Sequence, residues 1–315
     1  MAGELVLITG ATGMIGFRTL VFLLEAGYKV RAAVRNQAGF DKISQLKPVA
    51  PYASQLTSVI VPDITVDGAY DEAVKGVEYV VHVASPLASN APPGIDYDSY
   101  MIQPAIRGTV GILESAAKTT GVKKVVITGS ILSLVDAKTL GSGSYINAFN
   151  KTKEWVAEKK PSFSVNHVFP VFVLGRDDTV TTAEQIVKGT NNMLMGPLFG
   201  STRPPIPGGS VHLDDVARLH VLALEPKVED GQDFLAASQP LESFEWSDAA
   251  RIIKKHFPKA AADGIFQLDH VEKVVTLQTK VDSTKAEKLF GFKFKNFEEQ
   301  VQSVVGHYLE LKGNN

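Results

Sequence analysis

The chain has 315 residues, of which 44% are hydrophobic and 21% charged, with a formal net charge of −2 and no cysteine. This length is enough to bury a large α/β core, and we expect two unequal lobes. The balanced charge argues against a nucleic-acid partner or an anionic membrane surface. The absence of cysteine excludes disulfides, thiolate metal sites and a cysteine nucleophile.

Short apolar segments alternate with longer helix-like stretches through the first half of the chain. The expected strands are Leu5–Ile8, Val30–Val34, Val59–Val61, Tyr79–Val83 and Lys124–Thr128. Buried parallel strands are continuous apolar runs, and this alternation is typical of βαβ units. We therefore predict an α/β protein with a Rossmann-type, doubly wound parallel sheet.

The character of the sequence changes at about Arg176. The run from Arg203 to Gly209 contains three prolines and does not suit a parallel core strand. Val211–Ala217 again resembles a strand end that leads into a helix. We predict a dinucleotide-binding domain over residues 1–175 with a returning piece around 210–237. Residues 176–209 and 238–315 would form a smaller C-terminal substrate lobe.

Three glycines follow the first expected strand at a spacing typical of a dinucleotide site. The first glycine of such a turn allows the tight bend, the second lets the backbone approach a pyrophosphate, and the third lets helix pack on strand. N–H groups at the helix start face the phosphates. The predicted cofactor-binding residues of the turn are Thr9, Gly10, Thr12, Gly13, Met14, Ile15 and Gly16. The alternative is a glycine-rich turn without a ligand.

The end of the second strand predicts which dinucleotide binds. NAD-selective sites carry an acidic residue there, but no Asp or Glu occurs between Gly27 and Asp41. Arg31 and Arg35 flank this strand instead, and a guanidinium at its end can bind a ribose 2′-phosphate. We predict NADP(H) as the cofactor, with Arg35 at the phosphate and Arg31 as a solvated charge at the strand end.

Seven segments spread over nearly the whole chain carry a pattern that resembles a known enzyme family. They are Thr9–Gly16, Val81–Pro86, Pro104–Thr109, Val125–Ser130, Pro170–Gly175, Val211–His220 and Lys285–Phe292. Together they resemble the extended short-chain dehydrogenase/reductases, in the group of dihydroflavonol reductases, cinnamoyl-CoA reductases and fungal aldehyde or ketone reductases. The resemblance implies further cofactor contacts from Asp63, Ile64, Ala84, Ser85, Pro86, Lys151, Pro170 and Val173. Asp63 would lie near the adenine, or be an ordinary loop aspartate.

In that family a serine, a tyrosine and a lysine carry the chemistry, and the last two are spaced Y-x-x-x-K on one helix face. Ser130 matches the serine, in Thr-Gly-Ser where Thr-Ser-Ser is more usual. Aligned on Lys151, the tyrosine position holds Asn147; aligned on Lys153, it holds Phe149. Tyr145 lies six residues before Lys151, so it points elsewhere on a regular helix unless the helix starts after it.

The stretch from Ser130 to Lys151, and the helix after it, are shorter than this family leads us to expect. An amide cannot replace a phenol as proton donor, although it can hydrogen-bond a carbonyl or enolate. We predict Ser130, Lys151, Asn147 and Tyr145 as the catalytic residues. The predicted function is NADPH-dependent reduction of a ketone or aldehyde on a small, fairly apolar molecule, with Tyr145, Asn147 or a water completing the proton path.

Two other functions stay open because the family tyrosine is missing. One is a non-redox enzyme on the same fold, such as a cyclase, isomerase or lyase of secondary metabolism. The other is a nucleotide-sensing binding protein without catalysis. Partners beyond a small-molecule substrate are not expected, and the protein would be a monomer or a homodimer.

The remaining predictions concern location and supporting residues. The chain start has no basic stretch or cleavage pattern and no apolar stretch is about 20 residues long, so we expect a cytoplasmic protein. His82 is expected to pack and orient, and His212 and His220 to be structural near a helix start, with no metal bound. An apolar group could form a substrate lid or an ordinary helix face: Met193, Met195, Leu198 and Phe199.

Overall fold

The computed structural model describes residues 3–85, 94–96, 98–134, 143–238 and 243–313, without the side chains of 143–145. The chain forms two compact units. The first comprises Met1–Phe169 and Ala217–Phe234, and the second comprises Pro170–Val216 and Leu235–Asn315. Pro170 and Val173, which were expected at the cofactor, therefore belong to the second unit.

A seven-stranded sheet in the order β10-β6-β5-β4-β1-β2-β3 forms the core of the first unit. Its strands are β1 (Leu5–Thr9), β2 (Lys29–Val34), β3 (Leu56–Ile60), β4 (Tyr79–His82), β5 (Lys124–Thr128), β6 (Ser164–Pro170) and β10 (Asp233–Ala236). All pairings from β3 to β6 are parallel. The strand order reverses at β1, which confirms the predicted doubly wound, Rossmann-type sheet. Ligands of such sheets bind at this switch point, outside the carboxyl ends of the strands.

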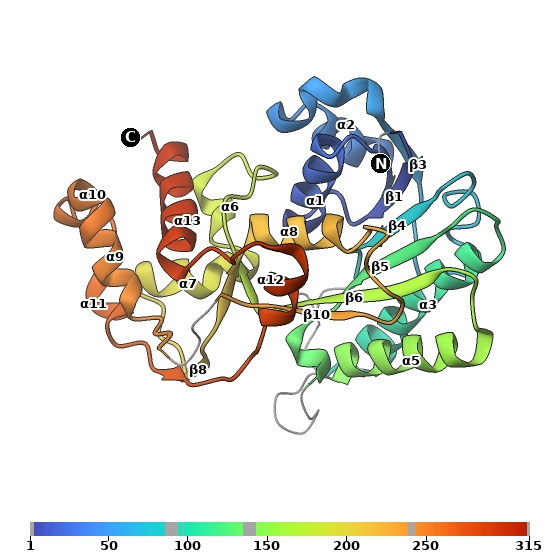
Figure 1. Ribbon diagram of the computed structural model, residues 1–315. Helices are drawn as coiled ribbons and strands as arrows, with labels where there is room; N and C mark the ends of the chain where they lie inside the picture. The colour runs from blue at the N-terminus through green and yellow to red at the C-terminus, as the bar shows by residue number, and fades with distance from the viewer. Residues whose placement is uncertain (1–2, 86–93, 97, 135–142, 239–242, 314–315) are drawn as a thin grey trace. The chain divides into compact units, whose positions relative to one another are not determined.

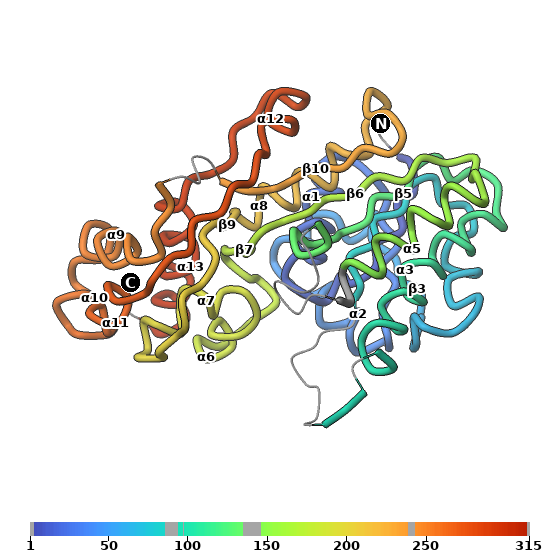
Figure 2. Tube along the Cα trace, turned by 90° about the horizontal axis from the view of Figure 1, so that it is seen from below, coloured from blue at the N-terminus to red at the C-terminus, as the bar shows by residue number. Residues whose placement is uncertain are grey.

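Helices cover both faces of this sheet (Figure 1). Helices α3 (Gln103–Ala117) and α5 (Gly143–Lys159) lie side by side on one face, and α1 (Met14–Glu25) lies on the other (Figure 2). This follows from right-handed crossovers that leave β1 in opposite directions. The other helical segments are α2 (Gln37–Ser44), a 3₁₀ helix at Lys47–Gln55, a π-helical turn at Asp98–Ile102 and a 3₁₀ turn at Ile131–Leu134.

Helix α1 forms where the apolar stripe of the sequence predicts it. Phe17, Leu20, Val21 and Leu24 are all at most 1% exposed, and burying each such side chain is worth about 1.5–3 kcal/mol. The helix ends before Gly27, whose φ of +89° is the left-handed conformation that glycine adopts without strain. The chain then turns into β2.

The third strand differs from its prediction. It runs from Leu56 to Ile60 instead of Val59 to Val61. It is the edge strand of the sheet, with Thr57 and Ile60 exposed. An edge strand that carries polar residues has no continuous apolar run, so the sequence pattern revealed only its last residues.

The segment Ala217–Phe234 returns to the first unit and is fastened to β5. Helix α8 (Leu213–Leu222) brings His220 to within 2.7 Å (Nε2) of Thr128 Oγ1, with His220 fully buried. Lys124 is 5% exposed and donates from Nζ to Glu225 O and Val228 O, each at 2.8 Å. Burial lowers the pKa of Lys124. The two backbone carbonyls hold the end of the returning segment against the sheet.

The second unit is mostly helical, with two small parallel sheets. One sheet pairs β7 (Phe172–Leu174) with β9 (Ser210–His212), and the other pairs β8 (Ile206–Pro207) with β11 (Thr276–Leu277). Its helices are α6 (Ala183–Ile186), α7 (Asn192–Leu198), α9 (Asp248–His256), α10 (Pro258–Ala262), α11 (Leu268–Val271), α12 (Thr284–Phe290) and α13 (Phe297–Leu311). Across the part of the chain that the structure describes, no helix has the length and apolar character to cross a membrane.

The apolar group at and just after α7, which was expected to form either a substrate lid or a helix face, packs in the core of the second unit. Met195 and Leu198 are fully buried in it, and Met193 and Phe199 are partly buried and pack against it. These side chains therefore form an ordinary helix face, which was one of the two predicted alternatives.

Candidate active site

The glycine-rich turn between β1 and α1 is fixed from inside by backbone contacts. A Cβ on Gly16 would lie 2.1 Å from Gly10 O, and a Cβ on Gly10 would lie 2.8 Å from Ala84 N. Gly10 also has a φ of +74°, which disfavours any other residue. Gly13 differs, because a Cβ there would meet nothing closer than Gly10 O at 3.6 Å. The turn is packed beneath and open above Gly13, as a pyrophosphate resting on the backbone requires.

The start of α1 forms the outer rim of this turn. Its N-cap residue is Gly13, which has no side chain to cap the helix, and its first turn contains no acidic residue. No carboxylate of that turn therefore offsets the partial positive charge of the helix start. Thr12 is exposed, and Met14 and Ile15 are half-buried. These features fit the phosphates of a dinucleotide.

Thr9 fastens the turn to the end of β4. Its Oγ1 accepts hydrogen bonds from Val83 N at 3.1 Å and Ala84 N at 3.0 Å. The hydroxyl proton is then left for His82 Nδ1, 3.0 Å away, so His82 carries its own proton on Nε2. Burial lowers the pKa of His82 to about 4 and keeps the ring neutral. His82 thus packs and orients, as predicted.

The two arginines around β2 have different surroundings. Arg31 donates from Nη1 to Ala73 O and Lys75 O, each at 2.8 Å. The prediction that Arg31 is a solvated charge was wrong, because the loop after β3 brings two carbonyl oxygens to it. Arg35 is exposed directly after β2 and, among the described residues, has no carboxylate oxygen within 4.0 Å. It is the cation that remains available to a 2′-phosphate.

The residues expected around the adenine follow β3. Asp63 Oδ1 accepts from Thr65 N at 2.8 Å and from Thr65 Oγ1 at 2.7 Å, and these bonds, with a smaller contribution from the charge of Arg35, lower the pKa of Asp63. Ile64 packs on α3, where a Cβ on Gly108 would lie 3.1 Å from its Cδ1. Asp63 is exposed and Ile64 half-buried. After β4, Ala84 and Ser85 are described, and Pro86 lies outside the described residues.

The end of β5 carries Ser130. Gly129 N donates to Val168 O at 2.8 Å, and a Cβ on Gly129 would lie 2.5 Å from Phe169 Cε1. The ring of Phe169 therefore explains why glycine replaces the more usual serine here. Ser130 is half-buried, and its Oγ accepts from Leu132 N at 3.3 Å, which closes the 3₁₀ turn.

Helix α5 turns Phe149 toward β6. The Phe149 ring lies 5.0 Å from those of both His167 and Phe169, and Lys153 Nζ lies 5.3 Å from its centroid. Asn147 is two residues earlier, about 200° around the helix, and Lys151 shares its face. Asn147 and Lys151 are both exposed, and Lys151 Nζ binds Glu154 Oε2 at 2.6 Å.

The structure thus separates the two sequence registers. Phe149 faces β6 and adjoins Ser130 through Phe169 and Gly129, whereas Lys153 is exposed and only its Nζ lies over the Phe149 ring. Asn147 and Lys151 point away from β6, and the side chain of Tyr145 lies outside the described residues. Sequence reasoning missed Phe169, although a glycine in place of a serine is a signal that a large ring packs against that position.

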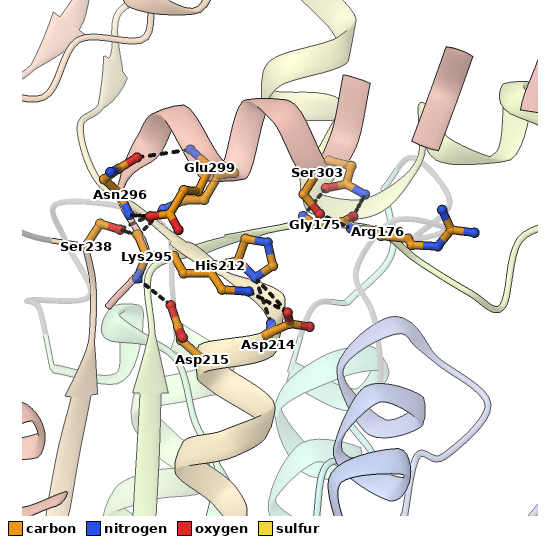
Figure 3. A network of polar contacts seen from close by, with 12 residues as sticks. Gly175, Arg176, His212, Asp214, Asp215, Ser238, Lys295, Asn296, Glu299 and Ser303 are labelled. Carbon is orange, nitrogen blue, oxygen red and sulfur yellow. Dashed lines mark hydrogen bonds and ion pairs between the residues drawn. The ribbon is translucent and has the colours of Figure 1, made fainter. Parts of the chain in front are cut away.

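The segment around the start of α8 is a polar network in the second unit (Figure 3). Lys295 Nζ lies 2.6 Å from Asp214 Oδ2, and its backbone N donates to Asp215 Oδ2 at 2.7 Å. His212 Nδ1 accepts from Asp214 N at 3.0 Å, so His212 is structural, as predicted. Nowhere among the described residues do three or more His, Asp or Glu side chains form a group that could hold a metal ion.

A parallel sheet with a glycine-rich turn at its switch point defines a Rossmann-type protein. The chain belongs to the NAD-dependent epimerase/dehydratase family: residues 6–141 match the pattern of that family. The ketoreductase CTB6 of Cercospora nicotianae is 36% identical to it, over 99% of this chain and 96% of the relative.

Two further relatives extend the comparison. The putative NADPH-dependent methylglyoxal reductase GRP2 of Candida albicans is 27% identical over 96% of this chain and 98% of its own length. The yeast methylglyoxal/isovaleraldehyde reductase Gre2, solved with NADPH, has the same fold, with a TM-score of 0.82, 23% identity, and coverage of 99% of this chain and 100% of Gre2. The alignment with CTB6 spans 345 positions, more than the 315 residues of this chain, so that relative has segments that are absent here.

Proposed function

We propose that this protein uses NADPH to reduce a ketone or aldehyde group on a small, fairly apolar molecule. The observation that carries the proposal is the turn that is open over Gly13, with the exposed Arg35 nearby at the end of β2. This combination fits a dinucleotide with a 2′-phosphate. The printed names of the relatives, a ketoreductase and an NADPH-dependent reductase, support the type of reaction.

The cofactor contacts follow from the arrangement of the first unit. Backbone N–H groups at the start of α1 bind the pyrophosphate, and Arg35 binds the 2′-phosphate. Asp63 and Ile64 border the adenine, and Ala84 and Ser85 border the ribose side of the turn. The resemblance of the sequence adds Lys151, Pro86, Pro170 and Val173 to the proposed set, although Pro86 lies outside the described residues and Pro170 and Val173 belong to the second unit. The bound nicotinamide supplies the hydride that the carbonyl carbon receives.

Neither Asn147 nor Phe149 is a tyrosine, so the proton that the carbonyl oxygen receives must come from another group. Ser130 is proposed to hydrogen-bond the carbonyl oxygen. Asn147 can orient a water but cannot itself release a proton. Lys151, as an ammonium, or Tyr145 can supply the proton through that water. The protein's monomeric or dimeric state and its cytoplasmic location stay predictions from the sequence.

The cofactor part of the proposal is tested by replacing Arg35 with Gln. The KM for NADPH should rise at least about 10-fold, because one charge-assisted contact is worth about 1.5–3 kcal/mol. Lys42→Gln is the matched control, since Lys42 is an exposed cation on the neighbouring α2. NADPH oxidation would be followed with a panel of aldehydes and ketones. Equal KM values in both variants would refute the role of Arg35, and no turnover of any carbonyl by the native protein would refute the reduction.

The position of the proton donor is tested by restoring a phenol in each register. Phe149→Tyr places a hydroxyl on the face toward β6, and Asn147→Tyr places one on the exposed face. If catalysis uses the exposed face, Asn147→Tyr should raise kcat at least about 10-fold, in the range that general acids contribute, and Phe149→Tyr should not. The opposite result would move the catalytic lysine from Lys151 to Lys153.

A non-redox reaction is the second candidate, and the missing phenol is the observation that favours it. Neither register of α5 holds a tyrosine, whereas Ser130 and Asn147 can both polarise a carbonyl. The two candidates differ in hydride transfer. NADPH labelled with deuterium at the reactive carbon would pass the label to the product in a reductase and would keep it in a cyclase, isomerase or lyase.

A further inference from the structure

Phe169 lies near the carboxyl end of β6 and is fully buried within the first unit. Its ring stacks on the imidazole of His167, with 5.5 Å between the ring centroids and 18° between the ring planes. The ring of Phe149 on α5 approaches it edge-on, at 5.0 Å and 83°. Aromatic pairs in these geometries attract each other beyond the effect of burial. The ring of Phe169 is therefore held from two sides and cannot swing aside at low cost.

The imidazole on which this ring stacks is fixed in turn. His167 Nδ1 lies 3.0 Å from Asp233 Oδ1 on β10, and the backbone N of His167 donates to Gln232 O at 3.0 Å. The carboxylate of an aspartate only accepts hydrogen bonds, so Nδ1 carries the proton of this contact. Three elements of the first unit, β6, β10 and α5, thus hold the ring of Phe169 in one place.

The same ring packs against the backbone that follows β5. A Cβ on Gly129 would lie 2.5 Å from Phe169 Cε1 and 2.6 Å from Cδ1, so the ring fills the space of a side chain at that position. Gly129 N also donates to Val168 O at 2.8 Å, which ties this backbone to β6. Because the ring is held by other residues, it determines how closely the backbone of Gly129 approaches β6.

The hydroxyl that the proposed reaction needs belongs to the next residue. Ser130 Oγ accepts a hydrogen bond from Leu132 N at 3.3 Å, which leaves the hydroxyl proton to be donated to a carbonyl oxygen. A peptide bond links Gly129 to Ser130, so a displacement of the Gly129 backbone carries this hydroxyl with it. Displacement of a reacting group by about 1 Å can lower a rate about 100-fold.

We propose that Phe169 is a positioning residue: its ring sets the place of Gly129 and thereby aims the Ser130 hydroxyl at the carbonyl oxygen of the substrate. The inference rests on the proposed reductase function, in which Ser130 binds that oxygen. It adds a residue that acts without touching the substrate or the cofactor. Gly129 and Phe169 form a matched pair, since the lack of a side chain at one position makes room for the ring of the other.

The kinetic test compares two buried phenylalanines at opposite ends of β6, with the aldehyde or ketone of the panel that the native protein reduces fastest. Phe169→Leu should lower kcat at least about 10-fold and change the KM for NADPH less than about 2-fold, because only Ser130 is displaced. Phe163→Leu is the control, since Phe163 lies directly before β6, is 4% exposed and stacks on Trp155. It should lower the urea midpoint of unfolding about as much but change kcat less than about 3-fold. Equal losses of kcat in the two variants, or none in Phe169→Leu, would overturn the positioning role. Should Phe169→Leu not fold, Phe169→Met takes its place.

A second test measures the coupling between the two partners and needs no turnover. Gly129→Ala should lower the urea midpoint, because its Cβ meets the ring. In the double variant with Phe169→Leu the smaller side chain leaves room, so the combined shift should be smaller than the sum of the two single shifts. Additive shifts would show that the ring does not set the place of Gly129, and would contradict the proposal. If the two substitutions are coupled but the native protein reduces no compound of the panel, the reductase function fails while the packing of Phe169 on Gly129 stands.

Discussion

The cofactor turn and helix α5 carry parts of the same predicted active site, but different forces hold them. In the turn, Gly10 and Gly16 have no room for a side chain, and Thr9 uses its hydroxyl to tie three groups together. On α5, Asn147 and Lys151 lie on an exposed face, where packing places little constraint on their identity. Residues that are needed for both packing and chemistry therefore resist substitution. Residues needed for chemistry alone can be replaced without loss of the fold.

The largest effect is expected at Gly16, whose position in the turn leaves no room for a side chain. Gly16→Ala should lower the free energy of unfolding by about 3 kcal/mol, because the new Cβ meets the carbonyl of Gly10. Gly13→Ala, on the open side of the same turn, should change it by less than about 1 kcal/mol. Urea unfolding of both variants measures the difference. Equal stability of the two variants would mean that packing constrains Gly16 no more than it constrains the exposed Gly13.

A smaller effect is expected from the buried histidine behind the turn. Since burial lowers the pKa of His82 from 6.5 to about 4, the unfolded chain binds more protons than the folded one between these values. The contribution of His82 is therefore complete above about pH 6.5 and is lost as the pH falls toward 4, by about 2 kcal/mol between pH 7 and pH 5.

The variant His82→Asn isolates this contribution, because the amide can accept the proton of Thr9 but does not titrate. Its free energy of unfolding should fall less between pH 7 and pH 5 than that of the native protein. The difference between the two proteins is the quantity to measure, since burial lowers the pKa of His307 as well. Parallel pH curves would show that His82 is not buried in its neutral form.

The smallest effect is expected on the exposed face of α5. Lys151 and Glu154 form an ion pair whose side chains are 54% and 63% exposed. Lys151→Met should therefore change the free energy of unfolding by less than about 0.5 kcal/mol. If catalysis uses this face, kcat should fall at least about 10-fold in the same variant. A large loss of stability would show that this face is constrained by packing after all.

Much of the first unit could be predicted because its signals are local in sequence. β1 is an apolar run that both faces of the sheet bury, β2 and β5 are mostly so, and the glycine turn follows directly from β1. β3 was placed too late, because an edge strand with exposed Thr57 has no such run. The different surroundings of Arg31 and Arg35 could not be predicted from the sequence, because the carbonyl oxygens that bind Arg31 come from the distant residues Ala73 and Lys75.

The orientation of α5 could not be predicted for a similar reason. Whether Asn147 or Phe149 faces the sheet depends on His167 and Phe169, which lie on β6 and are distant in sequence. Both alignments were compatible with the spacing of the lysines.

The hydrogen bonds from Lys124 to the carbonyls of Glu225 and Val228 limit how the substrate specificity of this protein can evolve. The chain enters the second unit, comes back for Ala217–Phe234 and leaves again. A gene that exchanged one substrate lobe for another at a single junction would lose the piece that closes over β5. New specificities should therefore arise by gradual replacement of side chains more readily than by recombination of whole lobes.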